Sequence, residues 1–224
     1  MRCEMTKGTR KYIYMIIGIT LICLISGLLV RRSIVEIDIN DVLAKSDKYK
    51  ISNENFLEQE DYKSNDEIYD KADLIVKGKL TGKRKVLDGL VLSEISVENL
   101  YKGQCDKLIY VYEDVTIVGK DSGYIVVKNG YLPMIENKEY LLFLDKNNFT
   151  EEFKFIEGQN SSYKIVDNLL GKFPVEIDEN SFVINELSSE DINYYSEVAG
   201  KEQVFKDENM LNFYMERRNE ALKE

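Results

Sequence analysis

The chain lacks several residue types that catalytic and metal-binding sites often use. Its 224 residues include no histidine and no tryptophan, with two prolines and three cysteines. The absence of histidine excludes Ser-His-Asp and Cys-His catalysis, histidine-ligated zinc and an imidazole pH switch. Cys3 and Cys23 lie in or before the first apolar run, which leaves Cys105 alone in the remainder. A disulfide within the folded part is therefore impossible, and its core must hold it together.

Positive charge is also scarce. The chain carries 30 Lys/Arg against 40 Asp/Glu, a formal net charge of −10. Phosphate binding needs clustered Lys and Arg, so this balance argues against a nucleic-acid partner. Residues 31–224 hold 26 of the basic and 39 of the acidic residues, a balance of −13. A domain of this charge repels a polyanionic cell wall, and we expect a basic protein or peptide as its partner.

One long apolar run stands near the N-terminus. Residues 13–30 contain no charge and span about 27 Å as a helix, close to the thickness of a hydrocarbon core. Arg10, Lys11, Arg31 and Arg32 bracket the run and can reach lipid headgroups. No small-x-small cleavage site follows the run. The pattern predicts an uncleaved, single-pass membrane anchor.

The charges that flank the run do not fix its orientation. Residues 1–12 hold four Lys/Arg and residues 31–50 hold five, so the positive-inside count is nearly balanced. A long domain behind a short basic tail is usually translocated. We therefore expect the N-terminus in the cytoplasm and the soluble domain outside, with the reverse orientation as the alternative.

The hydrophobic pattern changes after residue 63. Ser64 followed by Glu67 is a capping-box pattern, which predicts a short helix. Over 74–184, apolar residues mostly recur with a period of two, and residues 140–144 are apolar on both faces. Seven or eight short strands separated by regular turns predict a sandwich or a small closed barrel.

Two turn dipeptides fall between the predicted strands. Asp88-Gly89 and Asn129-Gly130 both suit a type I′ hairpin turn. The second is predicted to join strands over 124–127 and 131–134.

The first predicted strand has two unusual features. Gly78 interrupts it, which indicates a bulge or a close approach of another chain segment. Further along, 83–85 reads Lys-Arg-Lys. This basic cluster is either a solvated hairpin end or a contact with anionic lipid headgroups.

Several short motifs together resemble a group of membrane-anchored bacterial domains with an OB-type barrel, which is similar to netrin modules and tissue inhibitors of metalloproteinases. The motifs are 72–79, 97–103, 139–144 and 171–173. The resemblance covers residues 64–185 and implies a mainly β fold, a small OB-like β-barrel flanked by short helices. The N-terminal cysteine and cystine framework of the metalloproteinase inhibitors are missing here, so their activity does not carry over.

These patterns divide the chain into five parts. The last of them shows apolar residues at helical spacing near the C-terminus. The predicted parts are a cytoplasmic tail at 1–12, a transmembrane anchor at 13–30, a stalk at 31–63, an OB-like β-barrel at 64–185 and a helical segment at 186–224.

Carboxylate pairs are the remaining source of catalytic chemistry. The candidates are Glu113-Asp114, Glu136 with Glu139, and Glu151-Glu152. Adjacent strand residues face opposite sides, and a chain with 40 acids forms such pairs by chance, so solvated surface is the favoured interpretation. No catalytic residue, metal ligand or cofactor is predicted. A carboxylate-based hydrolase acting on a cell-envelope glycan remains the alternative function.

Tyrosine is abundant, with fifteen in the chain. Tyr101, Tyr110 and Tyr112 lie in or beside the central predicted strands, and the last two share one face. An OB barrel binds ligands by stacking on aromatic strand faces, so these three are the candidate ligand-binding residues. The alternative is that they fill the core with their hydroxyls at its rim. The sequence thus predicts a membrane-anchored, extracytoplasmic binding or interaction module.

Overall fold

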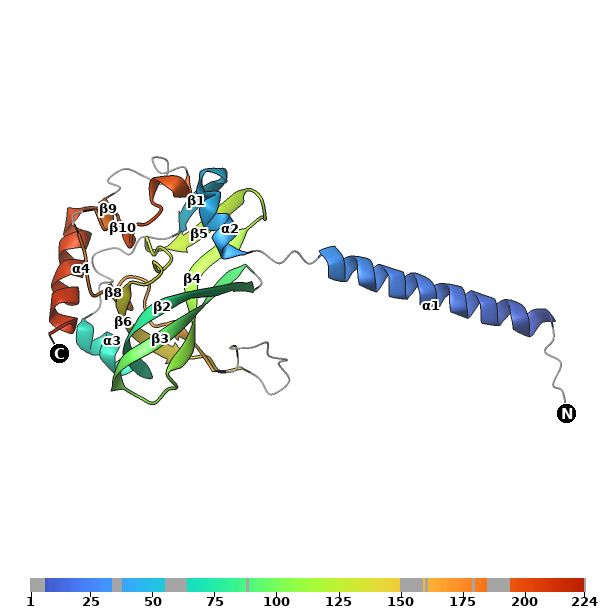
Figure 1. Ribbon diagram of the computed structural model, residues 1–224, viewed down its shortest axis with the longest axis horizontal. Coiled ribbons are helices and arrows are strands. Elements are labelled where there is room, and N and C mark those ends of the chain that lie inside the picture. The colour runs from blue at the N-terminus through green and yellow to red at the C-terminus, as the bar shows by residue number, and fades with distance from the viewer. Residues whose placement is uncertain are drawn as a thin grey trace. The chain divides into compact units, whose positions relative to one another are not determined.

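The computed structural model describes residues 7–33, 38–54, 64–87, 89–149, 159, 161–178, 180–184 and 194–223. The chain divides into two units, Met1–Glu36 and Ile37–Glu224. The first contains one helix, α1 (Lys7–Ser33), labelled in Figure 1. Among the described residues, no helix meets the combined length and apolarity expected of a membrane span.

The second unit is built mainly from strands, with a few short helices. Its helices are α2 (Ile39–Ala44), α3 (Asn65–Lys71) and α4 (Glu208–Ala221), with 3-10 turns η1 (Ser46–Lys48) and η3 (Tyr195–Glu197). Its strands are β1 (Tyr49–Glu54), β2 (Leu74–Leu87), β3 (Leu90–Lys102), β4 (Leu108–Val118), β5 (Gly123–Lys128), β6 (Glu139–Lys146), β7 (Ser162–Ile165), β8 (Lys172–Pro174), β9 (Phe182–Ile184) and β10 (Gln203–Phe205).

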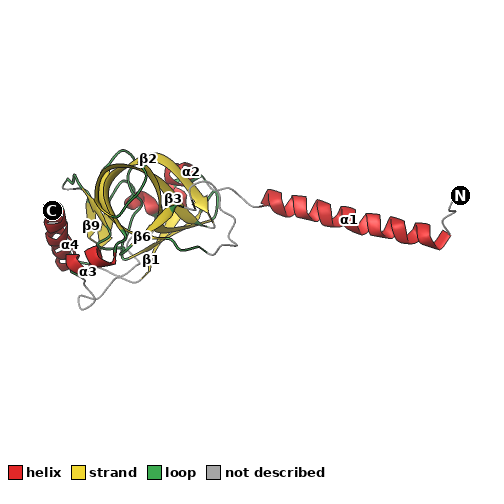
Figure 2. Ribbon diagram, turned by 90° about the horizontal axis from the view of Figure 1, so that it is seen from below, coloured by secondary structure: helices red, strands yellow, loops and turns green. Residues whose placement is uncertain are grey.

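Five strands close into a ring of paired neighbours. β2 lies between β3 and β6, both antiparallel to it, and β3 pairs with β4. β7 completes the ring, because it pairs antiparallel with β6 and parallel with β4. Figure 2 shows the strands curving round in this way. The ring-like sheet confirms the predicted mainly β fold, and the Ser64–Glu67 capping box at the start of α3 is formed.

Apolar residues fill the ring and also cover part of its outside. Leu74, Val76 and Val111 belong to the cluster inside the ring. A second cluster lies between the outer faces of β2 and β6 and the helices α3 and α4, and it includes Phe143 and Tyr214. The two clusters explain why 140–144 is apolar on both faces, as predicted for a doubly covered strand.

Residues 38–54 differ from the stalk predicted over 31–63. Ile39, Val42 and Tyr49 are buried in the main core, and β1 pairs in parallel with β5. The parallel partner lies about seventy residues away in sequence, so no local pattern revealed the pairing.

The C-terminal segment is likewise part of the second unit. β10 pairs with β9, and α4 packs on the outer cluster. The helix predicted within 186–224 is therefore present as α4, but a strand precedes it; residues 185–193 lie outside the described residues.

The turn at Asn129-Gly130 is present, but its second strand is not. Both residues have positive φ, 51° and 69°, and the Tyr131 N–H donates to the Lys128 carbonyl at 2.9 Å. The strand predicted over 131–134 is wrong: residues 131–135, here called the strap, carry a single bridge between Tyr131 and Gln203. Side chains hold the strap instead of a strand ladder.

Gly78 sits where the ring leaves no room for a side chain. It lies between β3 and β6, beside a register shift in the β2–β3 pairing. A Cβ atom there would lie 2.7 Å from the Ser96 carbonyl oxygen and 2.8 Å from Ile95 Cγ2. The close approach predicted from the sequence is therefore real.

We expect Gly78→Ala to lower the free energy of unfolding by about 1–3 kcal/mol, because the added methyl group forces the backbone of β3 to move. Urea unfolding followed by circular dichroism measures the change. Ser52→Ala, at an exposed strand position, is the control and should stay within about 0.5 kcal/mol of the unaltered chain. Equal stability of both variants would contradict the close packing at Gly78.

Candidate functional site

A buried carboxylate lies at the centre of a polar network inside the ring. Glu113 Oε1 accepts a hydrogen bond from Ser93 Oγ and lies 3.4 Å from Arg84 Nε. Glu113 Oε2 accepts hydrogen bonds from the Tyr131 hydroxyl at 3.2 Å and the Met134 N–H at 2.6 Å. Arg84 also donates to the Met134 carbonyl. One carboxylate therefore links β2, β3 and β4 to the strap.

A buried lysine extends the network toward the C-terminal segment. Lys172 Nζ donates to the carbonyls of Leu132 at 2.6 Å and Glu202 at 3.0 Å. The Glu202 carboxylate accepts hydrogen bonds from the Tyr140 hydroxyl at 2.9 Å and Lys138 Nζ at 3.0 Å. Burial lowers the pKa of Lys172 to about 8, although the nearby Glu202 charge opposes that shift.

This network contains the kinds of group that catalytic clusters use, but a substrate cannot reach its lysine. A lysine with a lowered pKa can act as a base or nucleophile when a substrate reaches it. Lys172 is only 1% exposed, and it stands over the Tyr131 ring at 4.2 Å. We therefore assign the network a structural role, which is to hold the strap in place. Arg84, expected at a solvated or lipid-facing basic cluster, points inward instead.

Burial of Lys172 and of several tyrosines gives the fold a distinctive alkaline stability profile. The pKa of Lys172 is about 8 in the folded state against 10.5 ordinarily, so between these values the unfolded chain holds more protons. The free energy of unfolding therefore rises with pH in that interval, by on the order of 2 kcal/mol. Burial also raises the pKa of Tyr131, Tyr140 and Tyr214 above the ordinary 10.0, so stability falls again above about pH 10.

Urea unfolding of a fragment covering 37–224, repeated from about pH 7 to pH 11, tests this profile. Lys172→Met should lose the rise and keep the fall. If the free energy of unfolding instead declines steadily from about pH 8, the pKa of Lys172 is not lowered in the folded state.

The structure separates the three predicted tyrosines. Tyr101 is 49% exposed near the end of β3. Tyr110 and Tyr112 share the outer face of β4, as predicted, and both are half-buried. The Tyr110 hydroxyl donates to Glu94 Oε2 at 3.1 Å, whereas the Tyr112 hydroxyl accepts a hydrogen bond from Gln159 Nε2 at 2.9 Å. Tyr110 and Tyr112 line two different pockets, and Tyr101 lines neither.

The pocket at Tyr112 has a volume of about 370 Å³ and a largely apolar lining. Leu87 and Leu90, the last residue of β2 and the first of β3, form one side. Phe149 and Gln159, from the connection between β6 and β7, form the other. The pocket therefore opens between the β2–β3 hairpin end and the β6–β7 connection, with β4 at its base.

The polar groups of this pocket carry both signs of charge. Asp114 lies on the same face of β4 as Tyr112 and pairs with Lys128 at 3.6 Å. Lys164 of β7 pairs with Asp145 at 3.1 Å. The pocket can thus hold an apolar group and offer a carboxylate, an ammonium group and amides at its rim.

The pocket at Tyr110 is more polar and has a volume of about 540 Å³. Lys83, Lys85 and Glu94 line it, together with Asp38 at the start of α2. Burial by itself raises the pKa of Glu94, but hydrogen bonds from Thr81 and Tyr110 and the nearby Lys83 charge hold that pKa below its ordinary value. Glu94 is thus a stably ionised carboxylate, which does not suit a general acid.

The structure describes two of the three candidate carboxylate pairs. Glu113 points inward and Asp114 outward. Hydrogen bonding to Lys79, with help from Lys77, holds the pKa of Glu139 below its ordinary value. A surface hollow of about 320 Å³ does gather acids, but Lys79 and Lys138 line it with Glu139, Glu176 and Asp178.

The third pair, Glu151-Glu152, lies outside the described residues. Among the residues that the structure does describe, no group of three or more Cys, Asp or Glu side chains is placed to hold a metal ion.

Sequence reasoning proposed Tyr112 as a ligand-binding residue but did not identify the residues that surround it in its pocket. The Asp88-Gly89 dipeptide predicted the hairpin, and so placed Leu87 and Leu90 at its end. Nothing in the sequence indicated that Phe149 and Gln159 would face that hairpin across β4. No protein-family model, curated protein or solved structure matches the chain.

Proposed function

We propose that this protein is a membrane-anchored, extracytoplasmic binding module whose ligand occupies the pocket at Tyr112. The observation that carries the proposal is the position of that pocket. It lies on the outer face of the ring, between the hairpin that joins the first two ring strands and the connection between the last two. OB-type barrels bind their ligands at this place.

The pairing of the ring strands supports an OB-type barrel. The first ring strand, β2, pairs with the fourth, β6, and the third, β4, runs parallel to the fifth, β7. Together with the antiparallel contacts, this order is that of a five-stranded Greek-key barrel.

The membrane anchor is proposed from residues 13–30. These residues lie within the continuous helix α1, about 40 Å long. Its large apolar side chains over 12–25 are exposed in the chain by itself, for example Ile22 at 65%. An apolar surface of this size requires a partner, and a bilayer supplies one.

The proposed ligand is a basic protein or peptide segment that inserts an apolar side chain into the pocket. Leu87, Leu90 and Phe149 provide the apolar walls, and Asp114 provides a carboxylate at the rim. The balance of −13 over residues 31–224 attracts a cationic partner. No geometric feature of the described residues favours the hydrolase alternative.

We expect Tyr112→Ala and Leu90→Glu to reduce capture of the partner from solubilised membranes by about tenfold or more. The first removes the aromatic base of the pocket, and the second places a charge among its apolar walls. Tyr101→Ala, outside the pocket, is the matched control and should capture the partner normally. The full chain serves as bait, and circular dichroism checks that each variant is folded.

If Tyr101→Ala and Tyr112→Ala capture the same amount of partner, whether normal or reduced, the pocket at Tyr112 is not the binding site. A muropeptide-release assay on the same preparations tests the alternative. Release of sugar fragments that depends on a particular Asp or Glu would favour a hydrolase over a binding module.

The orientation is tested with an engineered thiol at Tyr101, in a chain whose three cysteines are replaced by serine. Cys105 is a poor reporter, because it is half-buried and burial raises its pKa. We expect Tyr101→Cys to react with a membrane-impermeant maleimide in intact cells as fully as in lysed cells. Protection in intact cells followed by labelling after lysis would place the domain in the cytoplasm.

A further inference from the structure

The pockets at Tyr110 and Tyr112 lie next to each other on the outer face of the ring. In the β3–β4 pairing, Glu94 is opposite Tyr110 and Leu92 is opposite Tyr112. Leu92 and Glu94 line the first pocket, whereas Tyr112 lines the second. Alternate residues of a strand share a face, so the two tyrosines are about 7 Å apart along β4. A ligand that extends for a few residues along this strand reaches both pockets.

A carboxylate lies in a fixed position at the pocket of Tyr110. The side chain of Glu94 is only 6% exposed. Thr81 Oγ1 donates to Glu94 Oε1 at 3.0 Å, and the Tyr110 hydroxyl donates to Glu94 Oε2 at 3.1 Å. The two hydroxyls come from the strands on either side of β3, because Thr81 belongs to β2 and Tyr110 to β4. Both oxygens of this stably ionised group are therefore held by the sheet itself.

A cation of the chain itself contacts this carboxylate from the solvent side. Lys83 Nζ lies 3.4 Å from Glu94 Oε1, although the Lys83 side chain is 77% exposed. The contact shows that an ammonium group at the surface can reach Glu94. An ion pair with so exposed a lysine is weak, because water competes for its ammonium group. Another cation can therefore take the place of Lys83.

The other charged groups at this pocket remain balanced when a cation replaces Lys83. Lys85 and Asp38 also line the pocket and are exposed, whereas Arg84 turns inward to its buried partner. If Lys83 moves into solvent, Asp38 and Glu94 face Lys85 and the cation of the ligand. An anionic ligand would instead lie against the fixed charge of Glu94. The balance of −13 over residues 31–224 also favours a cation.

We propose that the pocket at Tyr110 binds a basic side chain of the ligand, which replaces Lys83 at Glu94, while an apolar side chain two residues away enters the pocket at Tyr112. This inference rests on the binding function proposed above and specifies the sequence pattern of the ligand. In an extended segment, residues two apart point to the same side and lie about 7 Å apart, which matches the spacing of the two tyrosines. Lys83 is an internal competitor of the ligand.

The test measures the affinity of dye-labelled peptides for the full chain in lipid nanodiscs, by fluorescence anisotropy. The peptides have blocked ends and a glycine–serine background, with arginine two residues before leucine in one and two residues after it in the other. Matched control peptides carry citrulline, an uncharged isostere, in place of arginine. Phosphatidylcholine, which has no net charge, is the lipid, so that the discs themselves do not attract the peptides.

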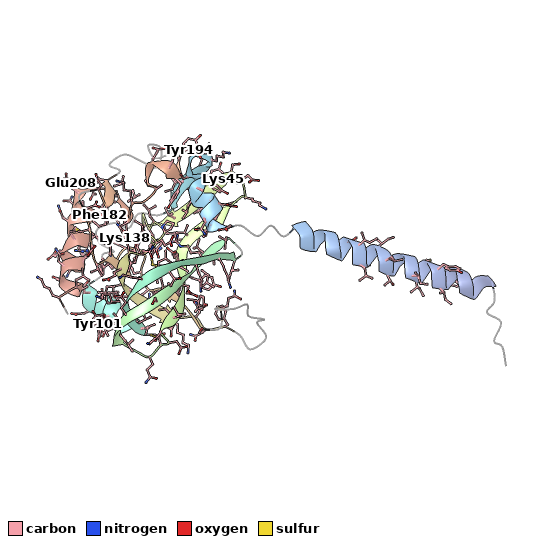
Figure 3. The ribbon with its side chains drawn as sticks, in the orientation of Figure 1. Lys45, Tyr101, Lys138, Phe182, Tyr194 and Glu208 are labelled. Carbon is pink, nitrogen blue, oxygen red and sulfur yellow. The ribbon has the colours of Figure 1, made fainter. Side chains whose placement is uncertain are left out.

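We expect the better of the two arginine peptides to bind about tenfold more tightly than its citrulline counterpart. Glu94→Gln should remove this difference. Lys83→Ala should bind the arginine peptide several-fold more tightly than the unaltered chain, because the competing ammonium group is gone. The control is Lys45→Ala, which removes another paired lysine, 3.0 Å from Asp121 and outside both pockets (Figure 3), and should leave the affinity nearly unchanged.

The direction of the Lys83→Ala effect decides the sign of the charge that this pocket binds. Weaker binding of the arginine peptide to this variant would overturn the inference, since Lys83 would then bind the ligand instead of competing with it. Equal affinity for the arginine and citrulline peptides, or no measurable binding of either, would also overturn it. Lys83 is an exposed residue, and circular dichroism checks that each variant is folded.

Leu90→Ser separates this inference from the proposed function on which it rests, because it weakens the apolar wall of the pocket at Tyr112 without adding a charge. If Leu90→Ser weakens the arginine and citrulline peptides alike and Glu94→Gln changes neither, the pocket at Tyr112 binds the ligand and the inference about Glu94 is overturned. If Glu94→Gln weakens the arginine peptide and Leu90→Ser has no effect, the basic side chain binds at Glu94 and the pocket at Tyr112 is not the ligand site.

Discussion

The buried carboxylate of Glu113 is the group on which the inside of the ring depends. It receives hydrogen bonds from β3 and from the strap, and it faces Arg84 of β2. A carboxyl group at this depth is tolerated only when hydrogen-bonding partners satisfy its oxygens. Removing one partner of such a pair typically costs about 3–5 kcal/mol, a large part of the stability of a domain of this size. The network therefore ties three strands and an irregular segment to one arrangement.

Lys172 connects the C-terminal segment to the ring in a similar way. Its ammonium group binds carbonyls of the strap and of Glu202, and its own carbonyl accepts a hydrogen bond from the Tyr214 hydroxyl of α4. The strap is held from one side by Glu113 and from the other by Lys172. The strap has no strand ladder, but polar backbone groups of Leu132, Met134 and Ile135 form hydrogen bonds with side chains of the core.

Arg84 of β2 and Glu113 of β4 point into the ring, and other residues of these two strands form its outer surface. The strand β4 is central to it, because its odd-numbered residues from Ile109 to Ile117 are buried while the alternate ones face out. Tyr112 and Asp114 lie at the pocket, and Val118 at the end of β4 is exposed.

The sequence by itself determined the local features. The alternation over 74–184 fixed the mainly β class, the capping box fixed α3, and the period of two placed Tyr110 and Tyr112 on one face. These features depend on neighbouring residues, which explains why they were predictable.

The tertiary structure decided what depends on distant partners. Residues 38–54 join the core through a parallel pairing with β5, and the predicted second strand at Asn129-Gly130 became a strap because Glu113 and Lys172 supply its hydrogen bonds. Lys172 is a charged residue that the sequence marks as surface, and only its buried carbonyl partners make its position stable. Tyr110 and Tyr112 line separate pockets. Their hydroxyl groups have different hydrogen-bonding partners, Glu94 for Tyr110 and Gln159 for Tyr112, which come from other parts of the chain. Contacts across such separations leave no periodic trace in the sequence.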